Sequence, residues 1–585
     1  MFKNEQKDIQ DKIHAYCREH GLPDLALEWK GIPFSGQWGI STSFFKLAAQ
    51  EVRSGKKINV AQRAQEIALS AADFLGDQQG FERIEAVQGY LNLYFSSAEY
   101  LKRVVDAVLE EGDNFGCGEH KNKRVMVEFS QPNTHKAFHV GHLRNVILGN
   151  AICNILDCAG FEVIRANYLG DIGLHVIQWL WNYQKHHADE EPGVDKIRWI
   201  GDIYVEAEQY YSESPEVEAE VRQLFRRWDR RDPEVVSLWE KTRQWSIEGF
   251  DQVYQLLDVH FDRVYFESEV EEPGKEIVKD LIKRGIARDE RPEGAVIIPL
   301  DEILGTKEKF RVMVVLRSDG TSLYSTKDLA LAVQKFEEYE LERSIYIIDV
   351  RQSLHFQQIF KTLEIMGLPW ADRCYHLPYE LVNLPGSVTM KSREGTVVLF
   401  EDLIREATQR ALDIVKIKNP DLTSEKQEDI ARLVALGAIK YPMVSRDNTK
   451  TLTFDWDTAL DFNGQTSPYI QYAYVRAGSI LRRANWKLPG SQTPNYELHP
   501  TEIELIDVIS RFPKEVQRAA EELRPIHIAN LSYELAKAFS DFYRNCPVLQ
   551  EDEQVMNMRL RLVYAARQAL KNVLGLIGID APEAM

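Results

Sequence analysis

The chain has 585 residues, of which 44% are hydrophobic and 28% are charged. This composition is typical of a soluble globular protein and excludes a largely disordered one. At roughly 150 residues per domain, the length corresponds to about four domains. The formal net charge of −19 argues against a basic surface over the whole molecule. Binding to a nucleic acid would therefore need local basic clusters, such as the one at residues 222–231.

The sequence shows no sign of a membrane or secretory segment. No apolar run approaches the roughly 18 residues of a membrane span, and the N-terminal residues lack the apolar core of a signal peptide. The six cysteines form no C-x-x-C pair. We therefore expect a cytoplasmic protein with no membrane partner, in a reducing setting, without a disulfide framework or a protein metal site.

Residues 1–115 are predicted to form an α+β unit. Helical patterns at residues 47–52 and 61–75 precede an alternating segment at 89–95, which is typical of a strand. A polar, glycine-bearing piece at residues 113–124 is predicted to be a linker.

The next stretch has the order strand, loop, helix, strand. Residues 125–130 form a β-type run, and apolar residues then recur at helical spacing up to Gly160. Residues 161–169 are predicted to be the second strand. This unit implies a parallel sheet, with a ligand site at the carboxyl end of the first strand.

The rest of the chain completes the domain plan. The pattern is helical from about residue 180 to 288, strands and helices then alternate, and helices dominate after residue 424. We predict an α/β fold with a Rossmann-type nucleotide-binding domain at 116–423, interrupted by the helical insertion. An α+β domain at 1–115 precedes it and an all-helical domain at 424–585 follows it.

A histidine pair lies between the first predicted strand and its helix, in the sequence His139-Val140-Gly141-His142. Imidazoles at a helix N-terminus can stabilise phosphate charge, helped by backbone N–H groups and the helix dipole. A glycine there lets a nucleotide approach the backbone closely. Taken alone, such a pair is more often structural or incidental; its position after a strand favours a nucleotide site.

The histidines are part of a longer resemblance. Residues 127–145, VEFSQPNTHKAFHVGHLRN, resemble the first signature region of class I aminoacyl-tRNA synthetases, and the arginyl branch in particular, with one residue changed at Gln131. Segments at 166–173, 201–207, 318–332, 349–367, 467–476 and 578–585 continue the resemblance in the same order.

This resemblance implies an activity. ATP would activate arginine to arginyl-adenylate with release of pyrophosphate, and the arginyl group would pass to the 3′ end of tRNA(Arg). ATP with Mg²⁺ is the implied substrate complex, with no tightly bound cofactor. The resemblance also implies a catalytic central domain, an N-terminal domain that binds the tRNA elbow, a C-terminal anticodon-binding domain and a monomer. In the family, tRNA must be present before the amino acid is activated.

Selection of arginine requires acceptors around a planar fork of five N–H donors, which carboxylates in a dry pocket satisfy best. Tyr324 and Asp328 are one helical turn apart on one face. The resemblance assigns both to the guanidinium group, and to the rest of the amino acid it assigns Glu128, Asn133 and Gln352. The alternative is that Asp328 pairs with Lys327 or caps a helix.

The resemblance also assigns His355 and Gln358 to the adenosine pocket, beside His139, Gly141 and His142. The alternative is that the first two only begin an amphipathic helix.

The second signature region departs from the family pattern. Class I enzymes carry a K-M-S-K-S loop whose lysines steady the leaving pyrophosphate, but here Thr389 and Ser392 stand at the lysine positions. We expect Lys391, Arg393 or both to take over this role, with Lys136 contributing. The alternative is that this segment is a basic surface turn.

Residues of the C-terminal helices match family positions that stack on unstacked anticodon bases. They are Tyr469, Tyr472, Phe539, Tyr543 and the terminal Met585. Each aromatic residue, taken alone, is more often a core residue; their collective placement favours the anticodon role.

Two other functions remain open. The chain could be another class I synthetase, such as the cysteinyl or glutamyl type, although Tyr324 and Asp328 argue against both. It could also be a synthetase-like RNA-binding protein whose catalysis has decayed, as the altered second signature suggests.

Overall fold

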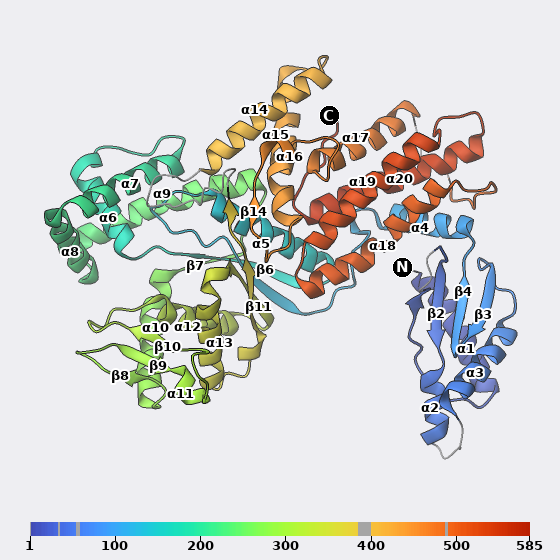
Figure 1. Cartoon of the computed structure of the whole chain (residues 1–585), viewed down its shortest axis with the longest axis horizontal. Coiled ribbons are helices and arrows are strands. Elements are labelled where there is room, and N and C mark those ends of the chain that lie inside the picture. The colour runs from blue at the N-terminus through green and yellow to red at the C-terminus, as the bar shows by residue number, and fades with distance from the viewer. Residues whose placement is uncertain (1, 33–35, 54–58, 384–398, 486–489) are drawn as a thin grey trace. The chain divides into compact units, whose positions relative to one another are not determined.

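A computed structural model describes residues 2–32, 36–53, 59–383, 399–485 and 490–585 (Figure 1). Contacts between Cα atoms divide the chain into two compact units. The first comprises residues 1–116, 473–514 and 531–572, and the second comprises residues 117–472, 515–530 and 573–585.

The first unit contains an antiparallel sheet of strand order β1-β2-β4-β3. The segment predicted as a strand at 89–95 is β4, which lies inside this sheet. The N-terminal elements are α1 (Lys3–Glu19), β1 (Lys30–Gly31), β2 (Gly39–Ser43), α2 (Phe45–Arg53), α3 (Val60–Leu75), β3 (Arg83–Val87), β4 (Tyr90–Tyr94), α4 (Ser97–Glu111) and η1 (Gly112–Asn114).

The second unit is organised around a five-stranded sheet of order β12-β11-β5-β6-β7, whose neighbouring strands all run parallel. Its strands are β5 (Arg124–Glu128), β6 (Glu162–Leu169), β7 (Arg263–Phe266), β11 (Leu341–Asp349) and β12 (Cys374–Tyr379). Helix α5 (Val140–Cys158) connects β5 to β6. The predicted strand–loop–helix–strand unit and its parallel sheet are thus confirmed.

The helical stretch after β6 has its own aromatic core. Four buried tryptophans hold its helices together: Trp179, Trp181, Trp228 and Trp239. Two of the helices begin with a capping side chain followed by proline, Ser214-Pro215 and Asp232-Pro233, which is a favourable helix start. The helices are α6 (Leu174–Asn182), η2 (Tyr183–His187), α7 (Lys196–Glu213), α8 (Pro215–Asp229) and α9 (Pro233–Leu257).

The predicted helical insertion at about 180–288 is interrupted by β7, a strand of the central sheet. A strand of four residues is too short to show a period of two, so the sequence pattern did not reveal it.

A smaller antiparallel sheet of order β10-β9-β8 follows and packs with α10, α12 and α13 around one apolar cluster (Figure 1). This region comprises α10 (Glu267–Lys283), β8 (Arg288–Asp289), β9 (Val296–Pro299), α11 (Leu300–Leu304), β10 (Val312–Leu316), α12 (Tyr324–Glu338), η3 (Val350–Gln352), α13 (Ser353–Ile365) and η4 (Ala371–Arg373).

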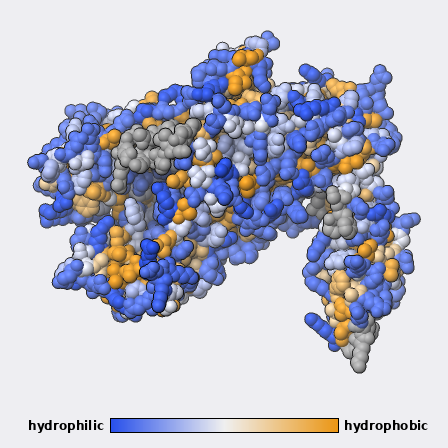
Figure 2. All heavy atoms as spheres, in the orientation of Figure 1, coloured by the Kyte–Doolittle hydropathy of each residue, from blue (hydrophilic) through white to orange (hydrophobic). Residues whose placement is uncertain are grey.

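The remaining chain is mainly helical, as predicted. It contains β13 (Val382–Asn383), α14 (Phe400–Lys418), α15 (Ser424–Val444), β14 (Leu452–Thr453), α16 (Trp456–Ala459), α17 (Ser467–Arg483), α18 (Pro500–Glu522), α19 (Ile526–Asn545) and α20 (Glu553–Leu576). Among the described residues, no helix is long and apolar enough to cross a membrane. Hydrophilic residues dominate the face drawn in Figure 2, and hydrophobic ones form scattered small groups.

One disulfide bond departs from the expectation of fully reduced cysteines. Cys117 and Cys158 are bonded, with their Cα atoms 4.5 Å apart. They are 41 residues apart in sequence, and they meet because the linker folds back on the end of α5, where the Gly118 amide donates to the Cys158 carbonyl. Spacing alone could not reveal that contact.

Candidate functional site

A cavity of about 950 Å³ opens at the carboxyl edge of the central parallel sheet. The ends of β5, β6, β11 and β12 contribute to its wall, together with α5, α12 and α13. This is where the strand–loop–helix–strand unit places a ligand site. The wall includes many of the residues that the sequence singles out: Glu128, Asn133, His139, Gly141, His142, Tyr324, Asp328 and Gln352.

Three other predicted site residues that the structure describes, Lys136, His355 and Gln358, are not part of this wall. Gln358 is buried and donates from Nε2 to the carbonyl of Phe310 at 2.6 Å, so its side chain holds a loop. His355 is not part of the cavity wall, although it contacts a residue of that wall. The Lys136 ammonium lies 4.9 Å from the centre of the Tyr204 ring. The cations predicted for the second signature, Lys391 and Arg393, lie outside the described residues.

The histidine pair forms the N-terminus of α5. His139 is the cap residue, and its Nδ1 accepts a hydrogen bond from the Gly141 amide at 3.1 Å. The His142 Nδ1 accepts from the His139 amide at 3.3 Å. The two rings stack with their centres 3.9 Å apart. The two histidines that are predicted to bind phosphate therefore also cap the N-terminus of α5.

Both histidines are neutral near pH 7. Burial lowers the pKa of His139 to about 4 and moves the pKa of His142 well below its usual value. Because each Nδ1 accepts a backbone hydrogen bond, the single ring proton lies on Nε2. Each imidazole can therefore donate from Nε2 to a ligand without carrying a positive charge.

The loop between β5 and α5 is held in an unusual backbone conformation. Ser130, Gln131 and His135 have φ angles of 76°, 49° and 60°, values that non-glycine residues rarely adopt. Asn145 supports this loop by accepting from the Ser130 amide at 2.7 Å. His135 is fully buried, and its Nε2 lies 2.8 Å from the Thr242 hydroxyl oxygen. It belongs to the scaffold of the loop.

Two buried ion pairs reach the cavity from α12. Lys335 pairs with Glu128, and the side chains are 0% and 2% exposed. The other carboxylate oxygen of Glu128 accepts from the side-chain amide Nε2 of Gln131 at 2.8 Å. Lys327 pairs with Glu267 at 2.6 Å. The alternative in which Lys327 pairs with Asp328 is therefore wrong.

Asp328 instead contacts a histidine. The His355 Nε2 lies 2.6 Å from Oδ2 of Asp328, and the Asp328 side chain is 17% exposed. Tyr324, one turn earlier on α12, is 62% exposed and also lines the cavity. The i, i+4 spacing thus brings a phenol and a carboxylate to the same wall, as the sequence predicts.

The sequence did not single out Glu267 or Tyr168, which also line the cavity. Burial raises the pKa of Glu267 to about 7, against the opposing effect of Lys327. Tyr168 has a buried hydroxyl without a hydrogen-bond partner in the described part of the chain. Both residues reach the cavity from the end of a strand. Tyr168 is near the end of β6, and Glu267 comes directly after β7. Recognition of β7 as a strand would have pointed to Glu267.

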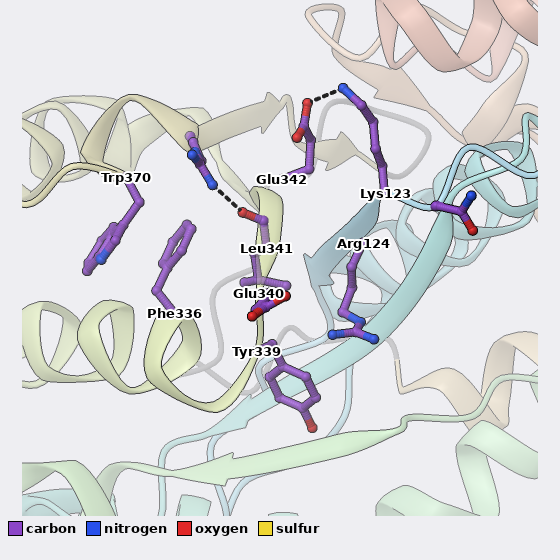
Figure 3. A pocket seen from close by; sticks show the side chains of 10 residues that line it. Lys123, Arg124, Phe336, Tyr339, Glu340, Leu341, Glu342 and Trp370 are labelled. Atoms are coloured by element: carbon purple, nitrogen blue, oxygen red, sulfur yellow. Dashed lines mark hydrogen bonds and ion pairs between the residues drawn. The ribbon is translucent and has the colours of Figure 1, made fainter.

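A second cavity, of about 380 Å³, lies at the opposite edge of the sheet near the start of β5 and β11 (Figure 3). Three of its charged side chains are bonded within the protein: Lys123 to Glu342, and Arg373 to the Leu341 carbonyl. The stacked rings of Phe336 and Trp370 line one side. None of the described residues that the sequence singles out lines this second cavity, whereas many line the first.

The predicted anticodon residues differ in exposure. Phe539 is fully buried and contacts Phe542, so it is a core residue. Tyr543 is 41% exposed, with the Arg476 guanidinium 4.9 Å from its ring centre. Tyr469 and Tyr472 are half-buried on α17, and Met585 is 9% exposed.

Comparison with known proteins identifies related families. Residues 104–456 match the model of the class I tRNA synthetase (R) catalytic domain, and residues 470–585 match the DALR anticodon-binding domain. The arginine–tRNA ligase of Clostridium perfringens is 36% identical over 514 residues, which cover 87% of this chain and 89% of that protein. That of Treponema denticola is 36% identical over 514 residues, 86% of each chain.

Solved structures give the same picture of the fold. The arginyl-tRNA synthetase of Thermus thermophilus aligns with a TM-score of 0.73 at 28% identity and covers 99% of this chain and 100% of that one. A Plasmodium falciparum enzyme aligns with a TM-score of 0.70 at 22% identity over 100% and 99% of the two chains, which is a likeness of fold.

Proposed function

This chain belongs to the class I arginyl-tRNA synthetases, and from that premise we propose that it ligates arginine to tRNA(Arg). Arginine and ATP would form arginyl-adenylate and pyrophosphate, and the arginyl group would then pass to the 3′ end of the tRNA. The observation that carries the proposal is one cavity that joins a carboxylate-bearing wall of α12 to the histidine-capped N-terminus of α5. One part suits a guanidinium group, and the other suits phosphates.

We assign the guanidinium to Asp328 and Tyr324, with Glu267 as a further carboxylate nearby. Carboxylates in a mostly buried wall match the five N–H donors of arginine. An amino acid without those donors would leave buried acceptors unpaired, which is the basis of strong discrimination. The assignment of the rest of the amino acid to Asn133, Gln352 and Glu128 is supported by their place in the same cavity.

We assign the ATP phosphates to the N-terminus of α5. His139 and His142 can donate from Nε2, and the helix dipole favours negative charge there. A Cβ at Gly141 would come within 2.9 Å of the His139 ring, so the absence of a side chain at this position leaves room for the imidazole. Lys136, Lys391 and Arg393 remain our candidates for steadying pyrophosphate. Mg²⁺ would enter with ATP, bound to its phosphates.

The tRNA is assigned to the flanking domains. We propose residues 116–423 as the catalytic domain, 424–585 as the anticodon-binding domain and 1–115 as the domain for the tRNA elbow. The match of residues 470–585 to a DALR domain supports the anticodon role. Tyr469 and Tyr472 are half-buried and Tyr543 is 41% exposed, and we propose that these partly exposed residues stack on anticodon bases. We further propose a cytoplasmic monomer.

The decisive experiment is ATP–pyrophosphate exchange with each of the standard amino acids, with and without total tRNA. Exchange with arginine alone, and only when tRNA is present, is the expected result. Exchange with another amino acid would keep the class and overturn the arginine assignment. No exchange, with tRNA still bound, would favour a protein with decayed catalysis. In this assay, His142→Ala should abolish exchange. A separate binding measurement should show that the variant still binds tRNA.

A further inference from the structure

Most acidic side chains of the cavity wall pair with a lysine or an arginine of the protein. Four acidic residues are found in its wall: Glu128, Glu267, Asp328 and Asp349. The first two pair with buried lysines of α12, as described above. Asp349 accepts from the Arg351 guanidinium at 2.8 Å. Three of the four carboxylates are therefore already matched by a lysine or an arginine.

Asp328 is the exception. Its contact in the described structure is His355, which reaches Oδ2, while no described residue donates to Oδ1. A histidine can donate one hydrogen bond from Nε2 without the permanent charge of a lysine or an arginine. The cavity therefore presents one carboxylate whose negative charge is not cancelled by a fixed cation, and arginine brings one guanidinium charge.

We propose that His355 is a positioning residue for arginine, acting through Asp328. Its hydrogen bond fixes the orientation of the carboxylate, so that Oδ1 and the net charge of Asp328 remain directed to the guanidinium. A carboxylate that is already held in position binds the paired N–H donors of a guanidinium group better than a carboxylate that must be ordered on binding. This inference rests on the proposed function, and it gives His355 a role different from the adenosine contact that the family resemblance implies.

The position of His355 supports this role over direct nucleotide binding. The residue is not part of the cavity wall, and its imidazole contacts that wall at Asp328. It lies in the first turn of α13, directly after η3, and the chain between Asp328 and His355 includes the whole of β11. The sheet thus brings α12, which we assign to arginine, into hydrogen-bond contact with α13, which the family resemblance assigns to ATP.

The test separates the two roles by the substrate whose KM changes. The variants are His355→Gln, which keeps a neutral donor at the Nε2 position, His355→Ala, which removes it, and His355→Lys, which adds a fixed cation. Aminoacylation with saturating tRNA gives KM for arginine and for ATP. Gln357→Ala is the matched control, because Gln357 is an exposed neighbour on the same helix.

We expect the arginine KM of His355→Ala to rise about tenfold, the loss of one hydrogen bond to a charged group. His355→Lys should raise it further, because the new charge cancels Asp328. His355→Gln should restore it to within about threefold of wild type. The ATP KM should stay unchanged in all three, and Gln357→Ala should match wild type. Melting temperatures identify any variant that fails to fold, and if His355→Ala fails, His355→Lys decides, since only the proposed role predicts that it raises the arginine KM.

Contrary outcomes are distinct from one another. A rise in ATP KM with unchanged arginine KM would overturn the inference in favour of the adenosine role. Unchanged arginine KM in His355→Lys would show that Asp328 does not need its charge. Wild-type protein that charges tRNA with another amino acid, or with none, would overturn the proposed function and this inference with it.

Discussion

Substitution of Asp328 by asparagine tests the arginine site most directly. The change keeps the shape of the side chain, and the asparagine carbonyl can still accept from His355. It removes the one negative charge of the cavity wall that no lysine or arginine of the described chain cancels. The expected consequence is a weakened interaction with the guanidinium group, with the ATP site intact.

The magnitude follows from burial. The Asp328 side chain is 17% exposed, so its charge is only weakly screened by solvent. Removing one partner of a buried, hydrogen-bonded charge pair costs about 2–5 kcal/mol. A middle value of about 3 kcal/mol corresponds to a loss of roughly 150-fold in kcat/KM for arginine.

Steady-state aminoacylation at varied arginine, with ATP and tRNA saturating, measures this loss. Asp349→Asn is the matched control, because Asp349 lines the same cavity but pairs with Arg351, whose side chain is 72% exposed. Because Arg351 already compensates the charge of Asp349, which is itself only 12% exposed, Asp349→Asn removes no unmatched charge from the wall, and we expect at most a roughly fivefold change, about 1 kcal/mol. Equal losses in the two variants, or an unchanged kcat/KM in Asp328→Asn, would refute the assignment of Asp328.

Three further predictions follow from the ion pairs and the disulfide. Because the pKa of Glu267 is raised to about 7, its carboxylate protonates as the pH falls through that value, and kcat/KM for arginine should fall with it; a pH profile of Glu267→Gln should lack this step. Lys335→Met should destabilise the protein by about 3–5 kcal/mol, because it leaves a buried carboxylate unpaired, and the double variant with Glu128→Gln should recover most of the loss in urea unfolding; equal destabilisation of the single and double variants would contradict a charge effect. Alkylation of the unfolded, unreduced protein should label four cysteines, and reduction should add Cys117 and Cys158; six labelled thiols before reduction would show that the bond is absent.

Local features of the site could be predicted from the sequence. The run of residues 125–169 specifies a strand, a capped helix and a second strand, because hydrophobic periodicity and a helix-start signal act over a few residues. The same is true of Tyr324 and Asp328, which share a helix face because they are four residues apart. The histidines had to lie at the carboxyl end of β5, since parallel strands place their following loops at one edge.

The partners of these residues were decided by the tertiary structure alone. Lys335 is 207 residues from Glu128, and Lys327 is 60 residues from Glu267. These pairs form because the sheet order β12-β11-β5-β6-β7 places distant segments side by side, and no periodicity encodes such a crossover. The family pattern assigned His355 to ATP, whereas its contact with Asp328 exists only once α12 and α13 pack together. Sequence therefore determined which groups bear the chemistry, and packing determined which of their charges remain available to a substrate, because charge compensation depends on distance in space.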